Sequence, residues 1–148
     1  MTNGLSNCRI DFYIPTAKSA DCQITLACRV TEKAFIAGFK IYLWCEGADQ
    51  MEKIDKQLWT FSQCSFIPHK ISDSYNNSVP VIIGESIPED DNIDAVISII
   101  DKPITAFKRF ARVAEIVGCE DVHKSLARER FRFYRDNGVE PLTHEIEI

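Results

Sequence analysis

The chain has 148 residues, of which 45% are hydrophobic and 26% charged, and its formal net charge is −5. A chain of this length buries about two thirds of its surface on folding, so a disulfide-dense mini-protein is excluded. The acidic balance argues against general electrostatic binding to nucleic acid or to an anionic membrane, and any basic site must be local. We expect one domain over residues 1–148.

The first half of the chain predicts strands alternating with helices. Polar and apolar residues alternate over 8–14, which predicts a strand, and apolar residues recur every three or four positions over 17–37, which predicts a helix. A second strand is predicted over 39–45. A second helix then runs to about Trp59, with one apolar stripe formed by Met51, Ile54 and Leu58.

The second half predicts more buried strands and a final helix. Residues 72–78 are polar and predict a loop, whereas 79–83 and 95–100 are short apolar runs typical of strands covered on both faces. A last strand is predicted over 113–117, followed by a helix over 120–137. The pattern predicts a three-layer α/β/α fold with a mostly parallel central sheet, Rossmann-like but without a glycine-rich nucleotide loop.

Location and redox state are also predicted. No apolar run approaches the roughly 20 residues of a membrane span, and the opening MTNGLSNC has neither the basic nor the apolar region of an export signal. We therefore expect a cytoplasmic protein without membrane contact. We expect the cysteines to be reduced and mostly buried, because most lie within apolar patterns and no C-x-x-C pair occurs: Cys8, Cys22, Cys28, Cys45, Cys64 and Cys119.

Patterns for cofactor, metal and catalytic sites are missing. No two glycines lie closer than nine positions, so neither G-x-G-x-x-G nor G-x-x-x-x-G-K-[ST] occurs. The pair Cys64 and His69 is attributed to chance, and the acidic stretch 85–94 is interpreted as a solvated loop rather than a magnesium site. We therefore expect no bound cofactor, no metal and no catalytic residues.

The final helix combines positive charge with an aromatic residue. Its apolar positions predict a core stripe formed by Val122, Leu126 and Phe133. An arc of about 100° on the opposite side carries Lys124, Arg128, Phe131, Arg132 and Arg135. The spacing therefore predicts that Phe131 points away from the core.

Such a face suits a ligand that combines carboxylates with an apolar side chain. Arginine binds carboxylates bidentately and the ring of Phe131 offers apolar contact, so an acidic, aromatic-ended peptide is one candidate. The first alternative is a solvated helix face, with Phe131 tucked under a neighbouring segment. The second is a surface for nucleic-acid phosphates, which the acidic remainder of the chain disfavours.

A second aromatic segment, LWTFSQCSFIPH, ends the second helix. Trp59 lies about 100° from the stripe that contains Leu58, so we expect it to reach the surface, where tryptophan is a typical interface anchor. Ordinary packing of the aromatic residues around the loop is the alternative.

The segments LWTFSQCSFIPHKI and SLARERFRFYRDNG resemble the chi subunit family of bacterial DNA polymerase III, an accessory protein of the clamp loader. The resemblance extends over nearly the whole chain. It implies a non-enzymatic α/β adaptor for DNA replication that links the clamp loader, through the psi subunit, to single-stranded DNA-binding protein. Contact with DNA is then only indirect.

The resemblance also implies particular site residues. The acidic C-terminal tail of single-stranded DNA-binding protein falls on Lys124, Arg128, Phe131 and Arg132, and the psi subunit falls on Trp59 and Phe66. Family members often have Tyr at the position of Phe131 and Lys at that of Arg132; Phe lacks the hydroxyl hydrogen bond, whereas Arg keeps the charge.

A hypothesis from another class is a small cytosolic α/β enzyme whose cofactor site lacks a glycine-rich loop. A deep pocket with perturbed carboxylates at the carboxyl ends of the strands would favour this hypothesis.

Overall fold

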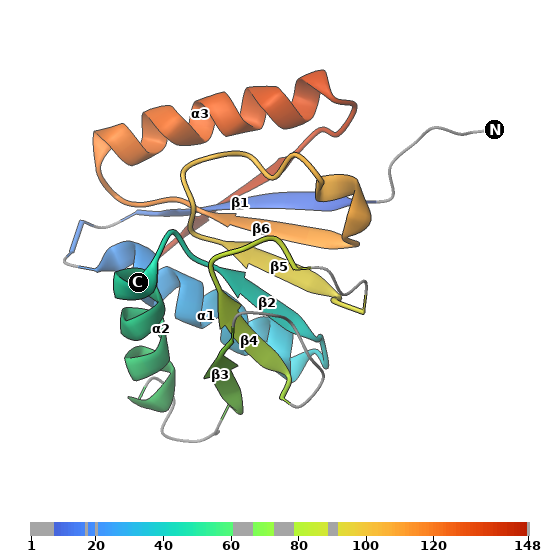
Figure 1. Ribbon diagram of the computed structural model, residues 1–148. Coiled ribbons are helices and arrows are strands. Elements are labelled where there is room, and N and C mark those ends of the chain that lie inside the picture. Colours follow the sequence, from blue (N-terminus) through green and yellow to red (C-terminus); the bar gives the residue numbers. More distant parts are fainter. Residues whose placement is uncertain are drawn as a thin grey trace.

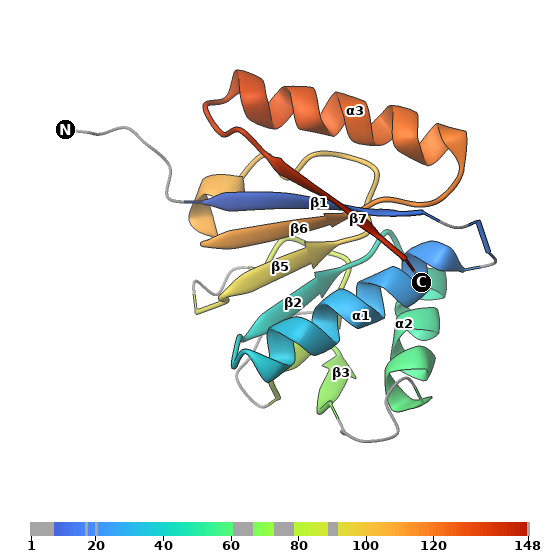
Figure 2. The ribbon, with the colours of Figure 1, turned by 180° about the vertical axis from the view of Figure 1, so that it is seen from behind.

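A computed structural model describes residues 8–16, 18–19, 21–60, 67–72, 79–88 and 92–147. All strand pairs are parallel, and they form one seven-stranded sheet in the order β3-β4-β2-β5-β6-β1-β7. Two helices, α1 and α2, cover one face of the sheet, and α3 covers the other (Figures 1 and 2). The predicted three-layer α/β/α fold is confirmed.

The elements follow the predicted alternation with two additions. In chain order they are β1 (Arg9–Pro15), α1 (Cys22–Ile36), β2 (Ile41–Trp44), α2 (Ala48–Thr60), β3 (His69–Ile71), β4 (Val81–Gly84), β5 (Ala95–Ser98), a 3-10 turn (Phe107–Arg109), β6 (Arg112–Ile116), α3 (Asp121–Asp136) and β7 (Leu142–Ile146). The sequence did not predict β3 and β7, the two edge strands of the sheet. The predicted start of α1, at residue 17, was also too early. Asp21 adopts a left-handed conformation with φ 58°, and α1 begins at the next residue.

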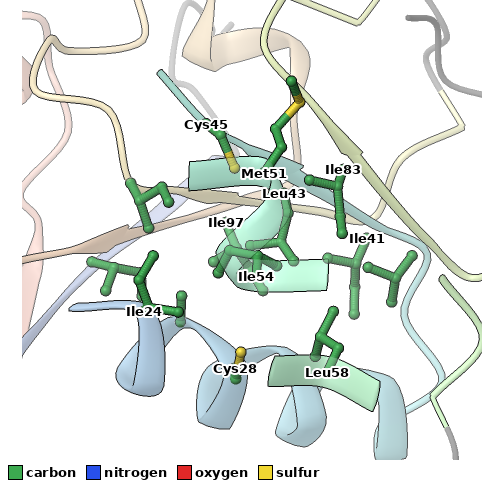
Figure 3. Packing of buried hydrophobic residues seen from close by; sticks show 14 of the residues in the cluster. Ile24, Cys28, Ile41, Leu43, Cys45, Met51, Ile54, Leu58, Ile83 and Ile97 are labelled. Atoms are coloured by element: carbon green, nitrogen blue, oxygen red, sulfur yellow. The ribbon is translucent and has the colours of Figure 1, made fainter. Parts of the chain in front are cut away.

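The core is divided by the sheet because successive strand residues point to opposite faces. On β2, Ile41 and Leu43 pack under α1 and α2, while Tyr42 between them packs on the α3 side. Figure 3 shows the first of these clusters, in which the predicted α2 stripe meets β2 and β5. The α2 stripe of Met51, Ile54 and Leu58 is buried as predicted.

The orientation of α3 differs from the prediction. Val122 is 58% exposed, and the buried residues of the helix are Ala127, Arg130 and Tyr134. The buried stripe thus lies about 90° around the helix from the predicted one. The cause is a buried carboxylate, Glu115 on β6, which binds side chains of this stripe.

The cysteine prediction was wrong for one pair. Cys22, the first residue of α1, forms a disulfide with Cys119, which lies just before α3, with the two Cα atoms 6.4 Å apart. The two positions meet because β1 and β6 are neighbours in the sheet and each cysteine follows one of these strands. Cys8, Cys28 and Cys45 are buried thiols, and Cys64 lies outside the described residues. Within the described ranges no helix is long and apolar enough to cross a membrane.

Candidate partner-binding sites

A buried hydrogen-bond network anchors α3 to the sheet. Arg130 Nε donates to Glu115 Oε1 at 3.1 Å, and the Tyr134 hydroxyl donates to Glu115 Oε2 at 2.5 Å. The same hydroxyl accepts the backbone N–H of Ile104 at 2.8 Å. Burial raises the pKa of Glu115 above its usual value, opposed by the charge of Arg130 and the hydrogen bonds. Replacing one partner would leave the others buried without compensation, so the network fixes which face of α3 meets solvent.

The side of α3 that faces solvent carries a row of cations. Lys124, Arg128 and Arg132 follow one another at intervals of four residues, so they lie along one side of α3. Arg128 and Arg132 are exposed, and Lys124 is partly exposed. Among the described residues, no carboxylate lies within salt-bridge distance of any of the three. We call this row, together with Phe131, the α3 basic site.

Phe131 lies between this row and the core. Its ring is 5.6 Å from the ring of Phe12 on β1, and the side chain is partly buried against the α3-side cluster. The prediction that Phe131 points away from the core was therefore wrong. It belongs to the margin of the buried face, which gives the cations a fixed apolar neighbour. Of the predicted residues, Lys124, Arg128, Phe131 and Arg132 are all brought to one side of α3.

The second predicted surface lies at the end of α2. Trp59 is 56% exposed, which confirms that it reaches the surface, and its ring is 4.8 Å from the ring of His69 on β3. Trp59 also borders an open groove of about 800 Å³ between α1 and α2, lined by Asp21, Ile24, Lys53, Lys56, Gln57 and Thr60. Phe66, the other predicted residue of this surface, lies outside the described residues.

The two surfaces occupy different parts of the molecule. In both views of the ribbon, α3 lies at the top of the molecule, whereas the end of α2 lies at the bottom, level with β3 (Figures 1 and 2). The two elements also belong to the two opposite layers, because α3 packs on one cluster and α2 on the other.

The place where doubly wound folds bind ligands is the carboxyl end of the sheet. Here a pocket of about 290 Å³ lies between the starts of the helices and is lined by acidic residues Asp21, Asp49 and Glu120 with Lys53. None of its described lining residues is a glycine, and the Cys22–Cys119 disulfide forms part of its wall. Glu115, whose pKa is raised, is fully enclosed and does not line it.

Within the described ranges, no group of three His, Cys, Asp or Glu residues is arranged to hold a metal ion. Nδ1 of His69 lies 2.7 Å from the carbonyl oxygen of Ile67, in the segment just before β3. Part of the acidic stretch, residues 89–91, lies outside the described residues.

Two groups of residues were missed by the sequence interpretation. The network of Glu115, Arg130 and Tyr134 joins residues far apart in the chain; a signal was the spacing of Arg130 and Tyr134, four residues apart on one helix face. The sequence interpretation treated His69 only as a metal ligand. Asp55 and Trp59 are four residues apart on α2, and both lie beside His69.

Together the fold and these sites describe an α/β protein with a cationic helix face and an exposed tryptophan, and with no glycine-rich loop in its sequence. The family described as "DNA polymerase III chi subunit, HolC" matches residues 8–142. The chain belongs to this family.

Individual relatives agree with this assignment. DNA polymerase III subunit chi of Pseudomonas aeruginosa is 33% identical over 138 residues, which cover 93% of this chain and 96% of that protein. The subunit chi of Escherichia coli is 29% identical over 115 residues, covering 76% of this chain and 78% of that protein. The crystal structure of T4 UvsW aligns with a TM-score of 0.66 and 8% identity, covering 97% of this chain and 42% of that one. This last likeness shows the fold alone.

Proposed function

We propose that the chain is a non-catalytic adaptor of DNA polymerase III, formed by a single domain over residues 1–148 and acting in the cytoplasm. In this proposal the α3 basic site binds the acidic tail of single-stranded DNA-binding protein through Lys124, Arg128, Phe131 and Arg132. A psi-like subunit of the clamp loader binds at Trp59 and Phe66. DNA is then reached only through the partner protein.

The observation that carries the proposal is the row of cations, which have no carboxylate partner in the described part of the chain, beside a half-buried ring. From Lys124 to Arg132 the helix rises about 12 Å, which matches about four residues of an extended peptide at about 3.3 Å each. A short acidic tail ending in an aromatic residue can therefore place carboxylates along the row. Its terminal ring can at the same time contact Phe131, where it removes apolar surface from water.

The proposal is tested with a fluorescent acidic peptide that ends in Ile-Pro-Phe. Fluorescence anisotropy should show binding that weakens as salt is added, because the cations are exposed and screened. A matched peptide without the terminal Phe should bind more weakly even in dilute buffer. Equal binding of the two peptides would contradict the role of Phe131 as the apolar half of the site.

The psi half of the proposal is tested by co-purification of the chain with the psi subunit of the same organism. Trp59 supports it, since a half-exposed tryptophan is typical of interface anchors. Failure of the two proteins to associate would refute this half and leave the tail site standing.

The enzyme hypothesis is tested by calorimetry with ATP and Mg²⁺. The carboxylates of Asp21, Asp49 and Glu120 line the pocket at the carboxyl end of the sheet and repel phosphate groups, so we expect no binding. Micromolar binding would favour a nucleotide-using enzyme over the adaptor.

A further inference from the structure

His69 is a buried imidazole directly beneath the exposed tryptophan. Its side chain is fully enclosed, although it belongs to the edge strand β3. Nδ1 lies 2.7 Å from the carbonyl oxygen of Ile67. A carbonyl oxygen only accepts hydrogen bonds, so Nδ1 carries the proton that is donated, and this bond fixes the orientation of the ring.

The other side of the ring faces α2. Nε2 lies 3.2 Å from Asp55 Oδ1, a close polar contact although the two atoms are not aligned as a hydrogen bond. Trp59 follows Asp55 by one helical turn on the same side of α2, and its ring contacts the imidazole at 4.8 Å with the planes tilted by 57°. His69 therefore lies against two α2 side chains at once.

This arrangement differs from ordinary burial of a histidine in a core. The imidazole is held by the backbone on one side and lies beside a carboxylate on another, while its ring contacts a side chain that is 56% exposed. Packing against the imidazole narrows the set of rotamers that a half-exposed indole samples. The contact with His69 therefore affects chiefly the affinity of a partner that binds the indole.

We infer that His69 is a positioning residue of the partner surface: it holds the Trp59 indole in the orientation that the psi-like subunit binds. The inference rests on the proposed function only for the identity of that partner. Ordering one side chain at an interface lowers affinity by about two- to tenfold. Loss of the imidazole should therefore weaken partner binding by this factor without any direct contact between His69 and the partner.

The experiment uses the full chain with Trp44→Phe, which leaves Trp59 as its one tryptophan, since the sequence contains two. Time-resolved fluorescence anisotropy and iodide quenching of Trp59 are compared between this protein and its His69→Ala variant. The matched control is His144→Ala, which removes an imidazole stacked on Tyr13 at 4.9 Å on the far edge strand β7. Circular dichroism and thermal melting report that each variant is folded.

We expect His69→Ala to add a fast local component to the anisotropy decay, to increase quenching and to weaken psi binding about two- to tenfold. His144→Ala should change none of these. Unchanged Trp59 fluorescence in a folded His69→Ala protein would overturn the inference. So would changed fluorescence with unchanged psi affinity, because Trp59 orientation would then be irrelevant to docking.

Two further measurements cover the remaining outcomes. If His69→Ala fails to fold, His69→Phe keeps a ring beneath Trp59 but loses both polar contacts, and the same loosening of Trp59 is expected. In the unmodified protein, nuclear Overhauser contacts between the imidazole and indole protons are expected, and their absence overturns the inference. If the parent protein does not bind psi, the proposed psi function fails, while the fluorescence comparison still decides whether His69 positions Trp59.

Discussion

Replacing Arg128 with alanine tests the α3 basic site at its centre. Arg128 is exposed, lies one turn from both Lys124 and Arg132, and has Phe131 three residues further along α3. A charge-assisted hydrogen bond to a carboxylate contributes about 1.5–3 kcal/mol. Two charges 4 Å apart attract by about 1 kcal/mol in water and about 4 kcal/mol near a protein surface, which brackets this range. Arg128→Ala should therefore weaken tail binding about ten- to a hundredfold.

The assay is fluorescence anisotropy with the acidic tail peptide at low and high salt. The difference between parent and variant should shrink as salt rises from 0.1 to 1 M, because the Debye length falls from about 10 to about 3 Å. Lys70→Ala is the matched control, since Lys70 is an exposed cation on β3 at the opposite edge of the sheet. If Arg128→Ala binds the tail as tightly as the parent protein, the row of cations is a solvated helix face.

Three further predictions concern other parts of the molecule. Trp59→Ala should weaken psi binding, measured by calorimetry, by about 1–4 kcal/mol. It should lower the free energy of unfolding by less than the roughly 3–5 kcal/mol that loss of a fully buried ring costs. A large loss of stability in thermal melting with unchanged psi affinity would make Trp59 a core residue. Folding raises the pKa of Glu115 above its unfolded value of 4.5. The contribution of Glu115 to stability therefore falls as the pH rises from 4.5 through the folded-state pKa. Urea titrations should show that Glu115→Gln is more destabilising at pH about 4.5 than at pH about 8. A pH-independent difference would contradict this. Reducing the Cys22–Cys119 bond frees a loop closed over 97 residues and should lower stability by up to about 4.7 kcal/mol, and a melting temperature unchanged by dithiothreitol would argue that the bond is not formed in solution.

Elements with a regular period were predictable from sequence, and short edge elements were not. The stripe of Met51, Ile54 and Leu58 marks the buried face of α2 because every member is apolar and packs on the sheet. The strands β3 and β7 lie at the edges, where the residues of β7 are exposed or only partly buried, so no apolar period remains to mark them.

The site was predictable in composition and not in orientation. Helical spacing alone brings Lys124, Arg128 and Arg132 to one side of α3, whatever the helix packs against. Which side faces the sheet depends on Glu115, a charge on another element that makes Arg130 a buried residue. Hydrophobicity ranks an arginine as exposed, so the rotation of α3 and the position of Phe131 could not be found from the helix sequence.

The separation of the two surfaces bears on how one small chain can act as a bridge. Trp59 contacts β3, and Phe131 contacts β1, which is five strand spacings away in the sheet. At about 4.8 Å per spacing, this is about 24 Å, several times the screening length of about 8 Å at physiological salt. Among the contacts between described residues the two surfaces share none, so changes at one should add to changes at the other rather than couple to them. A partner held at Trp59 and an acidic tail held at α3 would then bind independently, and the strength of the proposed bridge would follow from the two separate affinities.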